Sequence, residues 1–181
     1  MKPLPILLAA LFVRAVTTFA ADETVTYHVI GLFSHDREAD LRAVVEDLPG
    51  ITIASIDFDH AEVAFTYDPE FIFKGVKREE IVKRLDALVR DESNRTFAIE
   101  PVIPTPKEQL TQIEILVAGL DCKACCLAAY EAVAKIDGVV QATASFREGR
   151  VTALIDPAKT NRAALEEALK KKTVKLVTPA N

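Results

Sequence analysis

The residues of this chain best suited to chemistry are its three cysteines, Cys122, Cys125 and Cys126, which fall within five positions. A disulfide framework would distribute an even number of cysteines across the fold, so this cluster indicates a site. Thiolates are soft ligands that select Cu(I), Zn(II) and similar thiophilic ions such as Hg(II). The C-x-x-C spacing of Cys122 and Cys125 at a strand-to-helix junction can turn both sulfurs toward one point. The sequence therefore predicts a metal site at Cys122 and Cys125.

The number of sulfurs narrows the choice of metal. A closed structural zinc site uses four protein ligands, and here only two or three sulfurs are available, so Cu(I) or Hg(II) fits better than Zn(II). A helix is expected to begin near Ala124, and its positive end favours the thiolate form of nearby cysteines. Cys126 follows Cys125 directly and points about 100° away on a helix. We therefore expect Cys126 to be a buried thiol rather than a third ligand.

The chain also repeats itself. Val29-Ile30-Gly31-Leu32 and Val117-Ala118-Gly119-Leu120 lie 88 positions apart. The same offset relates further pairs, namely Leu48-Pro49-Gly50-Ile51 with Ile136-Asp137-Gly138-Val139, Phe58 with Phe146, Val63 with Val151, and Asp68-Pro69 with Asp156-Pro157. Such a constant register indicates two copies of one unit. After Asp68 the first copy carries extra loop residues around 71–75.

Each copy is predicted to run strand, helix, strand, strand, helix, strand. In the second copy, Ile113, Ile115 and Val117 alternate as in a strand, whereas Ala129 and Val133 recur at helical spacing. The predicted elements of the second copy begin with a strand at 113–117 and continue with 124–136, 139–147, 151–156, 161–172 and 173–177. Those of the first copy are 24–30, 38–48, 51–57, 61–67, 77–89 and 96–102.

This order predicts an α+β fold of two tandem ferredoxin-like βαββαβ sandwiches. The predicted domains are residues 21–102, without cysteines, and residues 112–178, with the C-x-x-C pair. The proline-rich segment 103–111 between them is expected to be a stiff, extended linker. In the second domain the topology places the cysteine loop, the hairpin at 147–150 and Lys170-Lys171-Lys172 at one end.

The second copy resembles the heavy-metal-associated domain of copper chaperones, of copper-transporting ATPases and of the periplasmic mercury-binding protein MerP. That family's loop reads Gly-Met-x-Cys-x-x-Cys, and Gly119-Leu120-Asp121-Cys122-Lys123-Ala124-Cys125 matches it with Leu120 in place of Met. Leu and Met have similar volumes, so Leu120 is expected to pack under the loop as that Met does. The resemblance covers residues 112–178 and, through the repeat, 24–102 more loosely. It implies a metal transporter or another heavy-metal-associated domain as a partner.

The first copy lacks the thiols. At the offset of the repeat, Ser34 takes the place of Cys122, Arg37 that of Cys125, and Glu38 that of Cys126. His35 in this loop and His60 in the following hairpin are expected at one end of the domain, where with Asp36 they could form a harder N/O metal site. The preferred interpretation is that the first copy binds no metal, because two imidazoles without a third ligand seldom form a site.

The N-terminus has the pattern of a secretory signal peptide. A short positive start precedes the apolar run 4–13, and Thr18-Phe19-Ala20 offers small residues for cleavage before Ala21. Arg14 interrupts the apolar run, which disfavours a spanning helix of about 20 apolar residues. We therefore expect residues 1–20 to be removed, the mature chain to have no membrane span, and the protein to be periplasmic or secreted.

Charge and motifs limit the remaining functions. The net charge is −5 and no basic block is present, so nucleic-acid binding is not expected. The sequence has no Ser-His-Asp arrangement, phosphate loop or HExxH motif, and an enzyme is not expected. The predicted function is extracytoplasmic binding of Cu(I) or Hg(II) by the C-x-x-C pair, for sequestration or for transfer to a partner. Two alternatives stay open: thiol–disulfide redox chemistry in an oxidising compartment, and a metal-independent protein-interaction module.

Overall fold

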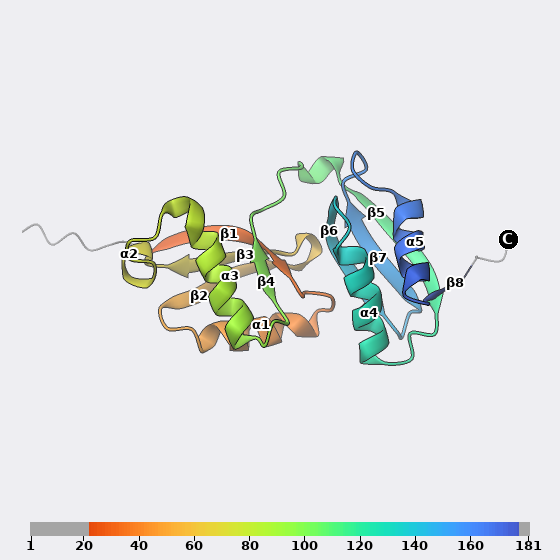
Figure 1. The fold of residues 1–181 in the computed structure, drawn as a ribbon, viewed down its shortest axis with the longest axis horizontal. Helices are drawn as coiled ribbons and strands as arrows, with labels where there is room; N and C mark the ends of the chain where they lie inside the picture. Colours follow the sequence, from red (N-terminus) through yellow and green to blue (C-terminus); the bar gives the residue numbers. More distant parts are fainter. Residues whose placement is uncertain (1–21, 178–181) are drawn as a thin grey trace, which may run out of the picture.

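The computed structural model describes residues 22–177, and the expected signal peptide at 1–20 lies outside them. The described chain forms two four-stranded antiparallel sheets, each with its own helices (Figure 1). Within this part of the chain, no helix is both long enough and apolar enough to cross a membrane.

The first sheet has the strand order β2-β3-β1-β4. Its elements are β1 (Glu23–Ile30), α1 (Asp36–Glu46), β2 (Ile51–Asp57), β3 (Glu62–Tyr67), α2 (Pro69–Ile72), α3 (Ile81–Glu92) and β4 (Ala98–Glu100). Short 3-10 turns lie at Phe58–His60 and at Arg78–Glu80.

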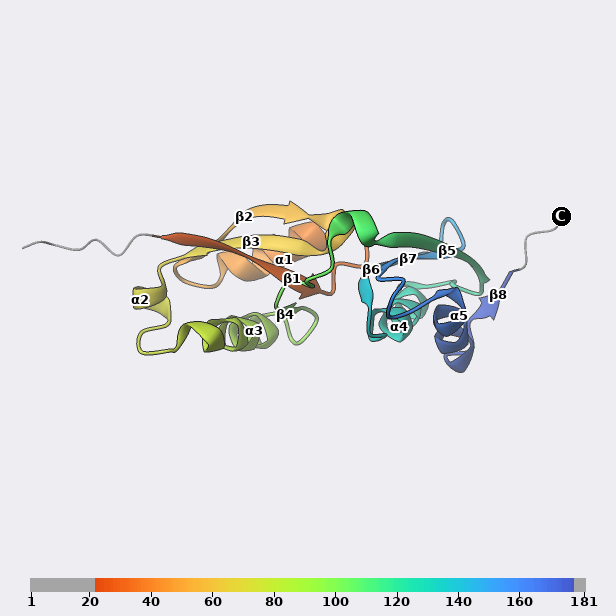
Figure 2. The same cartoon turned by 90° about the horizontal axis from the view of Figure 1, so that it is seen from above.

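The second sheet has the corresponding order β6-β7-β5-β8. Its elements are β5 (Thr111–Ala118), α4 (Lys123–Ala134), β6 (Val139–Ser145), β7 (Arg150–Ile155), α5 (Arg162–Lys171) and β8 (Lys175–Leu176). Figure 2 shows α4 and α5 together on one side of this sheet. The predicted fold of two tandem ferredoxin-like βαββαβ sandwiches is therefore confirmed.

The copies differ from the prediction mainly at their ends. The extra residues of the first copy form α2, whose Asp68 N-cap accepts hydrogen bonds from the N–H groups of Glu70 and Phe71. The helix predicted at 77–89 begins as a 3-10 turn and becomes α3 at Ile81. The last strand, predicted at 173–177, pairs over only Lys175–Leu176. The exact domain bounds stay a prediction.

Each domain buries a separate hydrophobic core between its helices and its sheet. In the first, Ile81, Leu85 and Val89 are buried at helical spacing on α3, while Phe65 and Tyr67 are buried at alternate positions of β3. In the second, the buried residues on the helices include Ala129, Val133, Leu165 and Leu169, and those on the strands include Ile115, Val151 and Ile155. Period 3.6 on the helices and period 2 on the strands thus produce one core per copy.

The two domains are in contact through the end of the first and the side of the second. We call the first-domain segment Ile30–Phe33 the docking loop; it meets α4 and the edge strand β6 (Figure 1). Ile30 and Phe33 pack against the core of the second domain. The docking loop occupies the position that the cysteine loop occupies in the second copy, so the loop without thiols has become an interdomain contact.

The linker is attached to both domains. The Thr105 hydroxyl donates to Asp156 Oδ2 at 2.8 Å in the second domain. Lys107 Nζ lies 2.8 Å from Asp57 Oδ2 and 2.9 Å from Glu62 Oε2 in the first. Burial by itself would raise the pKa of Asp57, but hydrogen bonds from Lys107 and His60 outweigh it and lower that pKa. The linker therefore contributes specific contacts as well as spacing.

The turn that joins α4 to β6 contains Gly138, and a substitution at this position tests the turn geometry. The φ of Gly138 is +88° and a Cβ there would lie 2.6 Å from Lys159 Cβ, whereas Gly75 has φ +77° with open space around it. Replacement by alanine costs about 1–2 kcal/mol at either site for the left-handed backbone. The free energy of unfolding of Gly138→Ala is expected to fall by at least about 1 kcal/mol more than that of Gly75→Ala, because the added methyl overpacks its surroundings. Urea unfolding of both variants measures the difference, and equal losses would contradict the turn geometry.

Candidate metal centre

The cysteine loop lies between the end of β5 and the start of α4. Gly119 turns the chain there with φ +82°, and Leu120 is buried beneath the loop, as the sequence predicted for that position. Cys122 is the N-cap of α4, and its sulfur accepts the backbone N–H of Cys125 at 3.3 Å. The loop therefore places Cys122 just before the helix and Cys125 in its first turn.

The two sulfurs face each other, with Cys122 Sγ and Cys125 Sγ 2.8 Å apart. Both cysteines are free thiols; Cys122 is exposed and Cys125 is half-buried. With metal–sulfur bonds of about 2.3 Å, a bound ion needs its sulfurs about 3.8 Å apart in tetrahedral geometry and about 4.6 Å apart in linear geometry. The sulfurs must therefore separate when a metal enters between them.

The hydrogen bonds around the pair make the two thiols unequal. When Cys122 ionises, its sulfur accepts from the Cys125 thiol and from the Cys125 backbone N–H, and these two hydrogen bonds lower the pKa of Cys122. The same thiol contact, together with desolvation, raises the pKa of Cys125. Cys122 is therefore the first of the two to become a thiolate, the form that binds metal and attacks electrophiles.

Cys126 belongs to the core of the second domain. It is only 4% exposed, packs among the buried side chains of that core, and has its pKa raised by burial. It has the buried character that the sequence predicted, and the facing pair consists of Cys122 and Cys125.

The turn before β8 brings lysines to the same end of the domain. Lys171 Nζ lies 2.8 Å from Glu167 Oε1, one turn earlier on α5. Lys170 and Lys171 occupy the last turn of α5, where cations complement the helix dipole. These contacts account for the lysines as a solvated helix end.

Scans against protein-family models and curated proteins found no match, whereas several solved structures are similar. The N-terminal domain of a potential copper-translocating P-type ATPase from Bacillus subtilis, in the Cu(I)-loaded state, is 30% identical over 37% of this chain and 84% of that one, with a TM-score of 0.36. The CopZ metallochaperone is 27% identical over 37% of this chain and 100% of its own, with a TM-score of 0.36. The N-terminal soluble domains of Bacillus subtilis CopA are 20% identical over 87% of this chain and 93% of theirs, with a TM-score of 0.35.

TM-scores of this size carry no weight, so sequence identity and the site itself decide the assignment. Identities of 27% and 30% extend over most or all of the two single-domain structures. In this chain the Gly119–Cys125 loop joins the first strand and first helix of a βαββαβ unit, where the family has its Gly-Met-x-Cys-x-x-Cys loop. The chain belongs to the heavy-metal-associated domain family. The thiols of that family are present in its second domain and absent from its first.

In the first domain, His35 and His60 are each paired with one carboxylate. His35 Nδ1 is 2.9 Å from Glu38 Oε1, and His60 Nδ1 is 2.9 Å from Asp57 Oδ2. Among residues 22–177, no group of three or more His, Cys, Asp or Glu side chains is positioned to hold a metal ion. That the first copy binds no metal stays a prediction from the sequence, with an N/O site at His35, Asp36 and His60 as its alternative.

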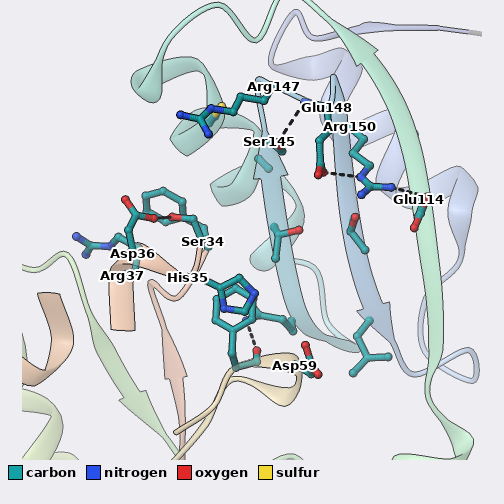
Figure 3. Close-up of a pocket in the computed structure, with 18 of the residues that line it drawn as sticks. Ser34, His35, Asp36, Arg37, Asp59, Glu114, Ser145, Arg147, Glu148 and Arg150 are labelled. Atoms are coloured by element: carbon teal, nitrogen blue, oxygen red, sulfur yellow. Dashed lines mark hydrogen bonds and ion pairs between the residues drawn. The ribbon is translucent and has the colours of Figure 1, made fainter. Parts of the chain in front are cut away.

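A cleft of about 1220 Å³ lies between the two heavy-metal-associated domains. Figure 3 shows Ser34, His35, Asp36 and Arg37 on the first-domain side, opposite charged residues from β5, β7 and the β6–β7 hairpin. Several of these charges are already paired; Arg150, for example, bonds to Glu148 at 2.7 Å and to Glu114 at 3.3 Å. Of the three cysteines only Cys126 borders the cleft, so the cleft and the facing thiols are separate features.

Sequence reasoning missed the residues that hold the domains together. Interdomain hydrogen bonds are made by His28, Tyr130 and Gln141. In the sequence each of these residues stands at an ordinary position of its own strand or helix and belongs to no motif. The one sign in the sequence is that these residues are polar. In the structure His28 and Gln141 are both 7% exposed, and a buried polar group needs a hydrogen-bond partner.

Selective alkylation tests the unequal thiols. In the reduced protein near neutral pH, iodoacetamide is expected to modify Cys122 first, Cys125 more slowly and Cys126 last. Removing the donor with Cys125→Ala should raise the pKa of Cys122 and move the midpoint of its alkylation rate to higher pH. Peptide mass spectrometry measures both effects. Cys126→Ala is the matched control and should leave the pH profile of Cys122 alkylation unchanged. A Cys122 profile that is the same in Cys125→Ala as in the wild type would contradict the hydrogen bond between the two thiols.

Proposed function

We propose that this protein binds one soft heavy-metal ion, Cu(I) or Hg(II), outside the cytoplasm through Cys122 and Cys125. The observation that carries the proposal is the pair of facing, accessible sulfurs at the start of α4, 2.8 Å apart. Soft thiolates select thiophilic ions, and a site with two protein sulfurs suits low coordination better than a closed four-ligand zinc site. The family relationship, with a Cu(I)-loaded domain among the similar structures, supports the same cargo class.

Open coordination makes the site suited to transfer as well as to storage. Cys122 is exposed and lies outside the helix, so a thiolate from another protein can approach the metal before Cys122 releases it. Cys125 is half-buried in the first helical turn and serves as the more firmly placed ligand. We propose sequestration or handover to a metal transporter or to another heavy-metal-associated domain, with binding and transfer rather than catalysis as the role.

The proposed location sets a condition on this function. An extracytoplasmic compartment is oxidising, and metal binding requires both thiols in reduced form. The closeness of the two sulfurs also favours the second candidate, thiol–disulfide redox chemistry, because a disulfide bond of about 2.05 Å needs only a small further approach.

Metal titration tests the main proposal. The reduced mature chain, titrated with Cu(I) or Hg(II) under argon, is expected to bind one tight equivalent, seen as ultraviolet thiolate-to-metal absorption. Cys122→Ser and Cys125→Ser should abolish it, because each removes one of two ligands. Cys126→Ser is the matched control and should retain it.

The outcomes separate the candidates. Binding that survives both Cys122→Ser and Cys125→Ser would refute the site assignment. A redox protein would instead exchange disulfides rapidly with a model dithiol, whether or not its reduced thiols also take up metal. Intact tandem domains that bind a partner equally well with and without both thiols would indicate a metal-independent module.

The proposed export is tested at the N-terminus. Expression of the full chain in a bacterium is expected to yield a periplasmic product that starts at Ala21, because residues 1–20 have the signal pattern. N-terminal sequencing and fractionation measure this. A cytoplasmic product that retains Met1 would contradict the proposed location and leave the metal site unaffected.

A further inference from the structure

The first domain contacts α4, the helix that begins at the cysteine loop. The Gly31 backbone N–H in the docking loop donates to the Tyr130 hydroxyl at 2.7 Å. The Phe33 ring lies against the Tyr130 ring with centroids 5.3 Å apart. Tyr130 is on α4, five residues after Cys125, or about 7–8 Å farther along the helix axis. The first domain therefore holds the middle of the helix whose first turn contains Cys125.

The neighbouring strand β6 is held in the same way. Gln141 Nε2 donates to the Leu32 carbonyl at 3.0 Å and to the Phe58 carbonyl at 2.7 Å, both in the first domain. His28 Nε2 lies 2.6 Å from the Val140 carbonyl. Val140 is available because the pairing of β6 with β7 shifts between Val139 and Gln141. These polar contacts lie in a buried interface, where a donor or acceptor left without a hydrogen bond destabilises the docked state.

Steric fit also ties the docking loop to its own domain. A Cβ at Gly31 would lie 2.4 Å from the Thr96 carbonyl oxygen and 2.7 Å from the Phe97 ring, whereas the equivalent Gly119 has open space. The docking loop is therefore packed from behind by the turn before β4 and from the front by Tyr130. The cysteine loop lacks this packing behind its glycine, so its position depends more on α4.

Metal entry requires the sulfurs to move apart, and one of them belongs to Cys125 in the first turn of α4. A helix already fixed at Tyr130 loses less conformational freedom when its first turn is ordered around a metal. A site that is ordered in advance binds more tightly because part of the entropy cost has already been met. Linkage then requires the metal to tighten the docking by the same factor.

We propose that the cysteine-free first domain is an intramolecular effector of the metal site, docked on α4 and β6 so that docking and metal binding strengthen each other. This inference rests on the proposed function of Cys122 and Cys125 and assigns a role to the copy that lost its thiols. The partner of the docking loop is the second domain of the same chain.

The Gly31 amide reports docking directly, since its N–H is bound to Tyr130 across the interface. Hydrogen exchange of the reduced, isotope-labelled full mature chain is followed by NMR without metal and with one equivalent of Hg(II). Metal is expected to slow exchange at Gly31 by at least about fivefold, the lower range of coupling between sites. The amide of Gly75, in an exposed loop of the same domain, exchanges through local opening; it is the control and should not change.

Gln141→Ala supplies the reciprocal measurement. It removes two interdomain hydrogen bonds without touching the cysteine loop, and it is expected to speed exchange at Gly31. Where it undocks the domains completely, metal affinity should fall by the same factor by which metal slows Gly31 exchange in the wild type. Gln112→Ala, the same change at an exposed position on β5, should alter neither quantity. Tyr130→Phe removes only the hydroxyl and provides the test if Gln141→Ala does not fold.

Each outcome has a distinct meaning. A metal-loaded protein whose Gly31 exchange matches that of the metal-free protein overturns the coupling and leaves the proposed function intact. An undocked Gln141→Ala or Tyr130→Phe protein with undiminished affinity does the same. A wild-type protein that binds no metal in reduced form overturns the proposed function, and this inference falls with it.

Discussion

The backbone N–H of Cys125 donates to the sulfur of Cys122, and this bond joins the cysteine loop to the start of α4. A helix N-terminus has N–H groups without intrahelical partners, and here the sulfur of Cys122 takes the place of the usual capping oxygen. The bond orients Cys122 toward Cys125 and favours its ionised form. The thiol contact and the capping bond together set the orientation and the order of ionisation of the two candidate ligands, at an end of the domain that the βαββαβ order leaves open.

The protein has two such ends, one in each sheet unit, and they make different contacts. In the second copy, the end of β5 leads into an exposed loop with two thiols. In the first, the end of β1 leads into the docking loop, whose Gly31 N–H and Leu32 carbonyl are bonded to the second domain. Since these backbone groups are engaged across the interface, the first loop could not also present a freely accessible metal site. The absence of cysteines from the first loop is consistent with its place in the interface.

The interface also covers the unpaired edge of a strand. β6 is an edge strand of the second sheet, and unpaired edges invite association with other chains. Gln141 and the shifted register at Val140 direct this edge to carbonyl and imidazole groups of the first domain. Thr105 and Lys107 secure the linker on the two sides of the same junction. The tandem arrangement therefore has contacts of its own beyond those of two independent sandwiches.

Local pattern in the sequence was enough to predict two copies, the order of elements in each, the facing pair Cys122 and Cys125, and the buried positions of Leu120 and Cys126. Periodicity, turn glycines and motif spacing act over a few residues, and each copy repeats them, so these features could be predicted before any coordinates. The docking could not. It joins residues as far apart as His28 and Val140, separated by 112 positions, and depends on shape and hydrogen-bond geometry that leave no periodic trace. The sequence determined which sulfurs form the proposed metal site. The tertiary structure decided that the copy without cysteines holds the helix on which they lie, because only folding brings the docking loop against Tyr130 and Gln141.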